Sequence, residues 1–231
     1  MPNKGRRVGR RRRLLRVAAG QEGLFTAAQA LDAGLDRRAR YHHLTYGNWR
    51  RTAAPQVFRL AGWPPDQHER LRAWLLWAGP HALLTSWTAL GLAGLTGSGP
   101  ADPVDLEIPF GIGRSGRRRR HRLLRQLEDS GATESVRLHR AVTGAVTGAV
   151  SGIDGLRLRP PAEAVCAAIL SGRSSAALRL ATELLDSGLV EPGELSLAAR
   201  AAHCGPVSDL LVCRLMAGRP GMPTWPTLSS A

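Results

Sequence analysis

The sequence of 231 residues predicts a mostly α, α+β protein with small β elements, and three observations support this fold class. The first is a compact N-terminal module in which two short helical patterns precede two strand-like runs. The second is a middle region in which helical patterns surround isolated strand patterns, as in a small α/β domain. The third is a C-terminal region with helical periodicity only. We expect four segments: 1–13, 14–62, 66–202 and 203–231.

The first helix of the N-terminal module begins after Thr26. Gln29 follows three residues later, which is the capping-box spacing, so the helix should run to about Ala33. Gly34 then allows a positive φ, and Asp36 is a favourable N-cap for another helix. The pattern predicts two helices joined by a tight turn, which is a helix-turn-helix.

The second helix, from Arg37 to about Tyr46, has a basic outer face. We expect Ala39, His43 and Leu44 to turn inward. A recognition helix contacts bases and phosphates with its N-terminal turns. The outward residues are therefore candidate DNA contacts: Arg37, Arg38, Tyr41, His42 and Thr45.

Two short runs with aromatic and β-branched residues follow the helices. Residues 49–52 and 57–60 are separated by Ala-Ala-Pro-Gln, which favours a turn, so they predict a hairpin wing. Three wing arginines should reach phosphates or a minor groove: Arg50, Arg51 and Arg59. A basic helix is also commonly a solvated face, so the helix pair alone leaves both interpretations open. The wing and the flanking charge favour a winged helix-turn-helix that binds double-stranded DNA.

The net charge of +14 is concentrated in two arginine-rich runs. Met1–Arg16 holds eight basic residues and Arg114–Arg125 holds seven, with no acid in either. Removing these fifteen from the 32 basic residues leaves seventeen against 18 acids. Such runs attract polyanions without sequence specificity; a solvated tail or loop, or attraction to anionic lipid, are the alternatives. We expect a disordered basic tail over 1–13, a basic loop over 111–122, and these accessory basic residues: Arg10, Arg11, Arg12, Arg13, Arg117, Arg118, Arg119 and Arg120.

The composition argues against membrane, metal and enzymatic roles. No segment approaches the ~20 apolar residues of a membrane span, and the basic N-terminus lacks the apolar core of a signal peptide, so we expect a cytoplasmic protein. Cys166, Cys204 and Cys213 lack metal-ligand spacing and should be buried thiols. We therefore expect no metal, no cofactor and no catalytic residues.

The middle and C-terminal regions contain further helices and strands. Helices are expected at 66–78 and 85–95, a half-buried strand at 103–110, and short strands at 135–140 and 156–158. The low-complexity sequence AVTGAVTGAVSG, residues 141–152, should form a flexible loop or a lengthened hairpin. Further helices are expected at 162–170, 174–187, 192–202 and 207–216.

Several segments together resemble a known family. GQEGLFTAAQALDAGLDRRARYHHL, GNWRR, VFRLAG and RLRAWLLWAGPHALLTSWTALGLAGL resemble AbiEi-type antitoxins, especially actinobacterial members, over residues 14–202. The resemblance implies a winged helix that binds and represses its own promoter. It also implies that the following domain counteracts a nucleotidyltransferase-like toxin in a type IV arrangement, in which direct contact is not required. The matching site positions are Arg37, Arg38, Tyr41 and His42 on the recognition helix, and Arg50 and Arg51 on the wing.

The chain departs from the family pattern at three places and resembles longer relatives at its end. Arg40 stands at a usually aliphatic inward position, Pro55-Gln56 replaces a common Pro-Gly turn, and residues 141–152 enlarge a strand connection. Residues 206–223 resemble the first helix of a nuclease-like domain, in which Asp209 corresponds to a first acidic residue. Its metal-binding partners do not follow, so we expect residues 203–231 to be a remnant without cleavage activity.

Two alternatives to a DNA-binding regulator remain open from the sequence. One is a module that binds a protein or RNA partner through residues 66–202. The other is an inactive, truncated remnant of a nuclease-bearing relative. The oligomeric state is also open, since a palindromic operator requires two winged helices, from a dimer or from two monomers.

Overall fold

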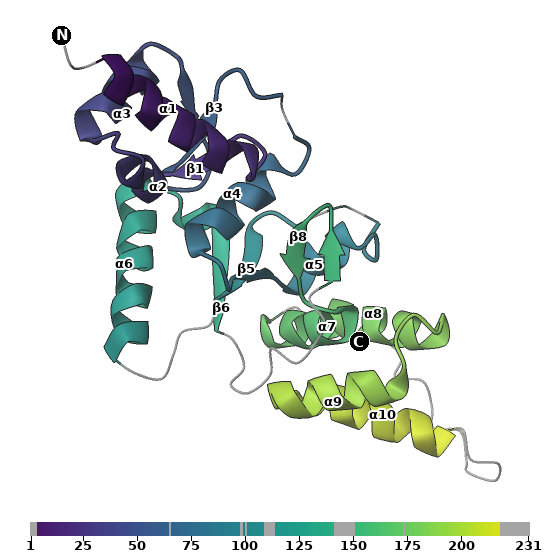
Figure 1. The fold of residues 1–231 in the computed structure, drawn as a ribbon. Coiled ribbons are helices and arrows are strands. Elements are labelled where there is room, and N and C mark those ends of the chain that lie inside the picture. The colour runs from purple at the N-terminus through teal and green to yellow at the C-terminus, as the bar shows by residue number, and fades with distance from the viewer. Residues whose placement is uncertain are drawn as a thin grey trace. The chain divides into compact units, whose positions relative to one another are not determined.

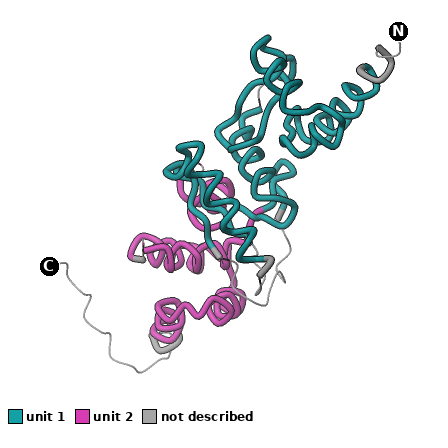
Figure 2. The backbone as a smooth tube through the Cα atoms, turned by 90° about the vertical axis from the view of Figure 1, so that its left-hand side faces the viewer, with its two compact units in different colours: residues 1–84, 101–141, 152–157 teal, residues 85–100, 142–151, 158–231 magenta. Residues whose placement is uncertain are grey.

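The computed structural model describes residues 4–64, 66–97, 99, 101–108, 114–140, 151–172 and 174–217, and it confirms the α+β fold class (Figure 1). The chain forms two compact units, which Figure 2 distinguishes by colour. Unit 1 comprises residues 1–84, 101–141 and 152–157, and unit 2 comprises residues 85–100, 142–151 and 158–231. Most of the low-complexity segment, residues 141–150, lies outside the described residues.

The N-terminal module of unit 1 has the order of helices and strands expected for a winged helix, and it is called the winged helix below. The expected helix pair and hairpin are present, and the hairpin belongs to a three-stranded antiparallel sheet of order β1-β3-β2. Strand β1, which pairs with β3, was not predicted. The elements in chain order are α1 (Lys4–Ala19), β1 (Leu24–Thr26), α2 (Ala27–Asp32), α3 (Arg37–Thr45), β2 (Trp49–Arg51) and β3 (Val57–Leu60).

Helix α1 occupies most of the segment that was expected to be a disordered tail. Leu14 and Ala18, on successive turns of this helix, are 2% and 0% exposed in the core of the winged helix. Two apolar residues four positions apart lie on one face of a helix. This highly charged segment can therefore bury that face when it is helical. The prediction of disorder was therefore wrong for residues 4–13.

Aromatic packing forms the centre of the winged-helix core. The ring centroid of Phe25 lies 4.7 Å from that of Trp49 and 5.9 Å from that of Phe58. Such pairs stabilise a fold by about 0.5–1.5 kcal/mol beyond the apolar area they bury. Gly23, at φ 79°, precedes β1, and a Cβ there would lie only 2.2 Å from Cγ of Trp63. The chain therefore requires glycine where Trp63 covers the start of β1.

The second sheet has five strands in the order β6-β5-β4-β8-β7. Helix α4 (Glu69–Ala78) contacts β1 and β3 of the winged helix as well as β5 of this sheet. The predicted helix at 66–78 and the strands at 103–110, 135–140 and 156–158 are thereby confirmed within a few residues at their ends. The strands are β4 (Leu83–Leu84), β5 (Val104–Ile108), β6 (Val136–Arg140), β7 (Ser151–Ile153) and β8 (Leu156–Leu158).

Strand β5 is buried on both faces, so its predicted half-burial was wrong. It has neighbours on both edges, β6 in parallel and β4 antiparallel. Its polar residues Asp105 and Glu107 are 0% and 7% exposed. Asp105 Oδ1 lies 2.8 Å from His139 Nε2 and 3.8 Å from Arg137 Nη1, and both partners come from β6. The alternation along β5 therefore produces one apolar face and one ion-paired face, and both are buried. It does not produce a core face and a solvent face.

Helix α6 (Arg114–Ser130) connects β5 to β6, followed by a short 3₁₀ turn, η1 (Thr133–Ser135). Parallel neighbouring strands require a crossover connection, and a helix is the usual solution. The basic loop expected over 111–122 is therefore a helix from Arg114 onward, and residues 111–113 lie outside the described residues.

Unit 2 is helical, and its helices confirm the predicted positions. Helix α7 contacts α5, α8 and α9, and α10 contacts α8 and α9. Cys166 and Cys204 are buried as expected, but Cys213 is exposed on α10, so that prediction was wrong for one of the three cysteines. The helices are α5 (Ser86–Leu92), α7 (Pro161–Leu170), α8 (Ser174–Asp186), α9 (Pro192–Ala202) and α10 (Gly205–Ala217).

Candidate nucleic-acid interface

Local hydrogen bonds fix the orientation of α3, the expected recognition helix. At the start of α2, the Thr26 backbone N–H donates to Gln29 Oε1 at 2.8 Å, and the Gln29 N–H donates to Thr26 Oγ1 at 3.1 Å. Gly34 has φ 88° in the turn, and Asp36 Oδ1 accepts from the Ala39 N–H at 2.8 Å. The capping box, the turn glycine and the second N-cap are all confirmed.

The faces of α3 are those that the sequence predicts. Ala39, His43 and Leu44 are partly buried. Tyr41 is 73% exposed, although a tyrosine ring gains stability from burial. The exposed residues of α3 include every predicted DNA contact on this helix: Arg37, Arg38, Tyr41, His42 and Thr45.

His43 belongs to the core side of α3. Its ring stacks on Trp49 with centroids 4.7 Å apart and planes inclined by 16°. Burial lowers the pKa of His43, and the neighbouring charges of His42 and Arg11 lower it further. Its imidazole is therefore held neutral and acts in packing.

Arg40 connects α3 to the wing. Its Nη1 donates to Gln56 Oε1 at 3.1 Å, and its guanidinium carbon lies 6.0 Å from the ring centroid of Phe58. Gln56 sits in the wing turn at φ 58°, the conformation that the more common glycine would adopt readily. Sequence reasoning noted Arg40 as an unusual inward residue but missed this connection, because its partner lies sixteen residues away.

The three wing arginines have different environments. Arg50 and Arg51 are exposed on β2. Neighbouring residues of a strand point to opposite faces, and Arg51 is paired with Phe58, the residue beneath Arg40. Arg51 therefore lies on the sheet face that carries α3, and Arg50 lies on the other face.

Arg59 is not available for DNA. Its Nε lies 3.1 Å from Glu69 Oε2, and its Nη1 donates to the Trp63 carbonyl at 3.0 Å. Its side chain is only 12% exposed. The prediction of Arg59 as a DNA contact was therefore wrong, since this residue joins the wing to α4.

The arginines of α1 border the helix-turn-helix. Arg10, Arg11, Arg12 and Arg13 are all exposed. Arg10 packs over the turn, because a Cβ added to Gly34 would lie 3.0 Å from Arg10 Nε. Arg11 lines an open groove with His43 and residues of the wing. These charges are held by a folded helix against the candidate DNA-binding elements.

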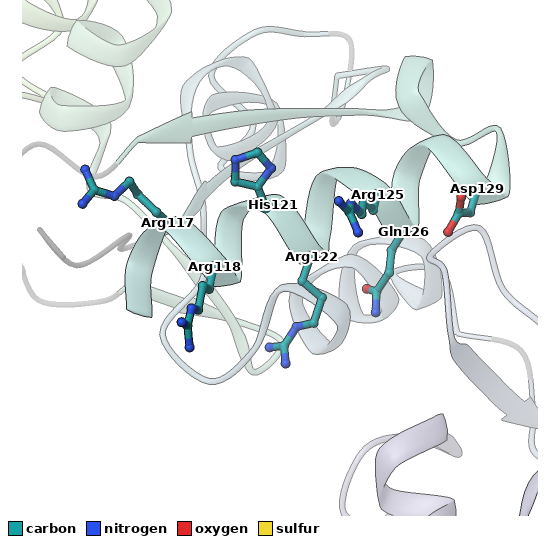
Figure 3. Close-up of a pocket in the computed structure, with 7 residues that line it drawn as sticks. All are labelled: Arg117, Arg118, His121, Arg122, Arg125, Gln126 and Asp129. Atoms are coloured by element: carbon teal, nitrogen blue, oxygen red, sulfur yellow. The ribbon is translucent and has the colours of Figure 1, made fainter. Parts of the chain in front are cut away.

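Helix α6 presents a second basic surface, drawn in Figure 3. Arg117, Arg118 and Arg120 are exposed as predicted. Arg119 differs, because its Nη2 donates to the Ala78 carbonyl at 2.6 Å and it is partly buried. Its expected accessory role was wrong, and it holds α6 against the end of α4.

Other features of the described residues bear on enzymatic or membrane roles. Those residues include no group of three His, Cys, Asp or Glu side chains arranged to hold a metal ion, and Asp209 is exposed on α10. Burial raises the pKa of Cys166 to about 12, so this thiol stays protonated and unreactive. No helix in the described part of the chain is both long and apolar enough to span a membrane.

Comparisons with known proteins give a fold. The sequence matches no protein-family model, and no curated protein matches it. The structure is similar to the crystal structure of the Rv2827c protein from Mycobacterium tuberculosis, with 14% sequence identity and a TM-score of 0.53. The match covers 91% of this chain and 78% of that one. At this identity, the likeness establishes a shared α+β fold.

Proposed function

We propose that this protein is a DNA-binding transcriptional regulator of the AbiEi antitoxin type. In this proposal it works in the cytoplasm, represses its own operon and counteracts a nucleotidyltransferase-like toxin. The observation that carries the DNA-binding part is the outer face of α3, where Arg37, Arg38 and Tyr41 are exposed on a helix that is capped, set by a turn and tied to a wing.

Two physical arguments support α3 as the base-reading element. Arg37 and Arg38 occupy its first turn, and the N-terminal turns of a recognition helix approach base edges in a major groove. Arginine can donate two parallel hydrogen bonds to guanine, which discriminates against a wrong base by about 1–3 kcal/mol. Arg51, on the same side of the wing sheet, would contact phosphates and add affinity without base preference.

The test is a salt titration of binding to DNA from upstream of the protein's own gene and to scrambled DNA of equal length. We expect a preference for the upstream DNA that persists at ~0.2 M salt, because base contacts depend less on counterion release than phosphate contacts do. Arg37→Gln/Arg38→Gln should reduce this preference by about tenfold or more. Equal binding of both DNAs by the wild-type protein would overturn the regulator proposal.

A matched control is available in unit 2. Arg179 on α8 and Arg200 on α9 are exposed helical arginines outside the winged helix. The double variant Arg179→Gln/Arg200→Gln removes the same charge and should keep the sequence preference. Loss of preference in both double variants would mean that net charge, and not α3, is responsible.

The antitoxin part of the proposal is supported by the resemblance over residues 14–202. The proposal predicts a nucleotidyltransferase-like toxin encoded beside this protein, and the test expresses the full chain together with that toxin. Arg37→Gln/Arg38→Gln should release repression of a promoter reporter while still restoring growth, because neutralisation is assigned to the domain after the winged helix. Failure of the wild-type chain to restore growth would overturn this part and leave DNA regulation to be judged separately.

A further inference from the structure

The exposed side of α6 carries a dense positive surface outside the winged helix. Its basic residues, called the α6 basic face from here on, form two rows along the helix. One row holds Arg117, His121 and Arg125 at intervals of four, and Arg118 and Arg122 begin the other. Figure 3 shows Arg118 and Arg122 projecting from the same side of the helix. Arg120 is also exposed, but it lies outside these two rows and does not belong to the α6 basic face.

The order of charges along α6 opposes helix stability. A helix is stabilised by acids in its first turn and by bases in its last, because these charges complement its macrodipole. The first turn of α6 has no acid and its last turn has no base, and the acids Glu128 and Asp129 stand near its C-terminus. Arg118 and Arg122 are also a like-charged pair four residues apart, and such a pair destabilises a helix.

The inward side of α6 holds the helix in place. Leu123 and Leu127 are 4% and 3% exposed. The Trp77 indole Nε1 donates to Gln126 Oε1 at 2.9 Å, in addition to the Arg119 contact with α4. The outer arginines are therefore not needed for anchoring. Among the residues that the structure describes, no acidic side chain forms an ion pair with Arg118 or Arg122.

We propose that the α6 basic face binds the phosphate backbone of double-stranded DNA, as a second DNA-binding surface in addition to α3. At 17 residues the helix is about 25 Å long, and the major groove of B-DNA admits an α-helix. Each guanidinium can donate two hydrogen bonds to one phosphate. The proposal does not depend on DNA binding by the winged helix, because α6 belongs to a separate part of unit 1.

The chemistry of the face favours duplex DNA over other polyanions. Single strands are bound by stacking their bases on aromatic rings, and α6 contains no Phe, Tyr or Trp. The major groove of B-DNA admits a helix whose arginines can reach the phosphates on its edges, whereas the major groove of an RNA duplex is too narrow for one. An interfacial helix inserts apolar residues into lipid, but Leu123 and Leu127, two of the three leucines of α6, are already buried within the protein, and Leu124 is only 37% exposed.

The experiment compares two double variants of the full chain on a scrambled DNA duplex, followed by fluorescence anisotropy between ~50 and ~200 mM salt. Each phosphate contact contributes about 0.9 to the slope of log affinity against log salt. Arg118→Gln/Arg122→Gln should therefore lower the slope by about 1.8, which makes the loss of affinity across this range about 12-fold smaller. The control Arg179→Gln/Arg200→Gln should leave the slope unchanged.

An unchanged slope in Arg118→Gln/Arg122→Gln would overturn the proposal and leave α6 as a solvated face. Tighter binding to an RNA duplex, or to anionic phospholipid vesicles, that the same variant abolishes would also overturn it. Repeating the comparison in an Arg37→Gln/Arg38→Gln background separates the two surfaces. The same slope change is expected there, whether or not α3 binds an operator.

A stability measurement distinguishes binding from a structural role. Arg118→Glu places an acid near the start of α6 and four residues before Arg122, so the stability of the helix should be maintained or rise slightly. We expect an unchanged or raised Tm together with weaker DNA binding. A lowered Tm with unchanged DNA binding would show that the arginine serves the fold, against the proposal.

Discussion

Replacing Arg59 and Arg51 in separate variants tests the distinction between the two sides of the wing. Both are arginines of the same hairpin, and both were predicted to contact DNA. Arg59 is 12% exposed and bound to Glu69 and to the Trp63 carbonyl, whereas Arg51 is exposed. Arg59→Gln should therefore reduce stability, and Arg51→Gln should reduce DNA affinity.

The loss of stability expected for Arg59→Gln follows from the groups that would lose their partner. The carboxylate of Glu69 is 27% exposed and would lose its partner 3.1 Å away, together with the hydrogen bond of 3.0 Å to the Trp63 carbonyl. Hydrogen bonds to charged groups contribute about 1.5–3 kcal/mol, and the partial exposure of Glu69 places the loss near the lower end, at about 2 kcal/mol. In a chain of this length, that loss lowers Tm by about 4–8 °C.

Arg51→Gln should change the stability of the protein very little, but it should change DNA binding by a measurable amount. Surface substitutions usually change stability by less than about 0.5 kcal/mol. One lost phosphate contact should lower the salt slope by about 0.9. Thermal unfolding by circular dichroism and salt-titrated anisotropy on the same preparations give both values.

Two results would refute this reasoning. One is an Arg59→Gln variant with the wild-type Tm and a reduced salt slope, which would mean that Arg59 leaves Glu69 to contact DNA. The other is an Arg51→Gln variant whose Tm falls as far as that of Arg59→Gln. The double variant Arg59→Gln/Glu69→Gln should recover part of the lost stability, because it removes the unpaired carboxylate.

Two further predictions concern the packing of the winged helix. Gly23→Ala should lower the unfolding free energy by at least about 2 kcal/mol, because alanine is strained at positive φ and its Cβ would collide with Trp63. Denaturant unfolding measures this loss. The control Gly62→Ala should be nearly neutral, because a Cβ there meets nothing within 4 Å. The pKa of His43 is lowered from 6.5, so its folded state resists protonation and stability should fall as pH drops below 6.5. His43→Phe should weaken this acid sensitivity in Tm measured from pH ~7 to ~5, and an identical pH profile would contradict the assignment.

Local signals predicted the helix-turn-helix well. The capping box, the turn glycine and the Asp36 cap act over three or four residues, so their physical causes lie within the segment that they shape. The exposed face of α3 followed from helical periodicity alone. For these elements the sequence was sufficient to place the candidate site.

Charge and alternation were less informative, because each pattern fits more than one environment. The arginine runs in 1–13 and 111–122 predicted a tail and a loop, yet both lie largely in helices. Each helix has two leucine or alanine residues four apart that pack inward. The alternation in β5 predicted a solvent-facing side, but partners on β6 neutralise that side within the protein. The outcome depended on distant chain segments that bury a surface or supply an opposite charge.

The sequence by itself determined the helix pair α2 and α3 with its turn, the hairpin of β2 and β3, the helices of unit 2, and which side chains α3 exposes. These depend on backbone preferences and caps that act within a few residues. Only the tertiary structure decided that Arg59 pairs with Glu69, that Arg40 binds Gln56, and that Arg119 anchors α6. The physical reason is that the groups within about 4 Å of a guanidinium decide whether an arginine forms structural contacts or stays free to bind a ligand. Folding brings those groups from remote parts of the chain.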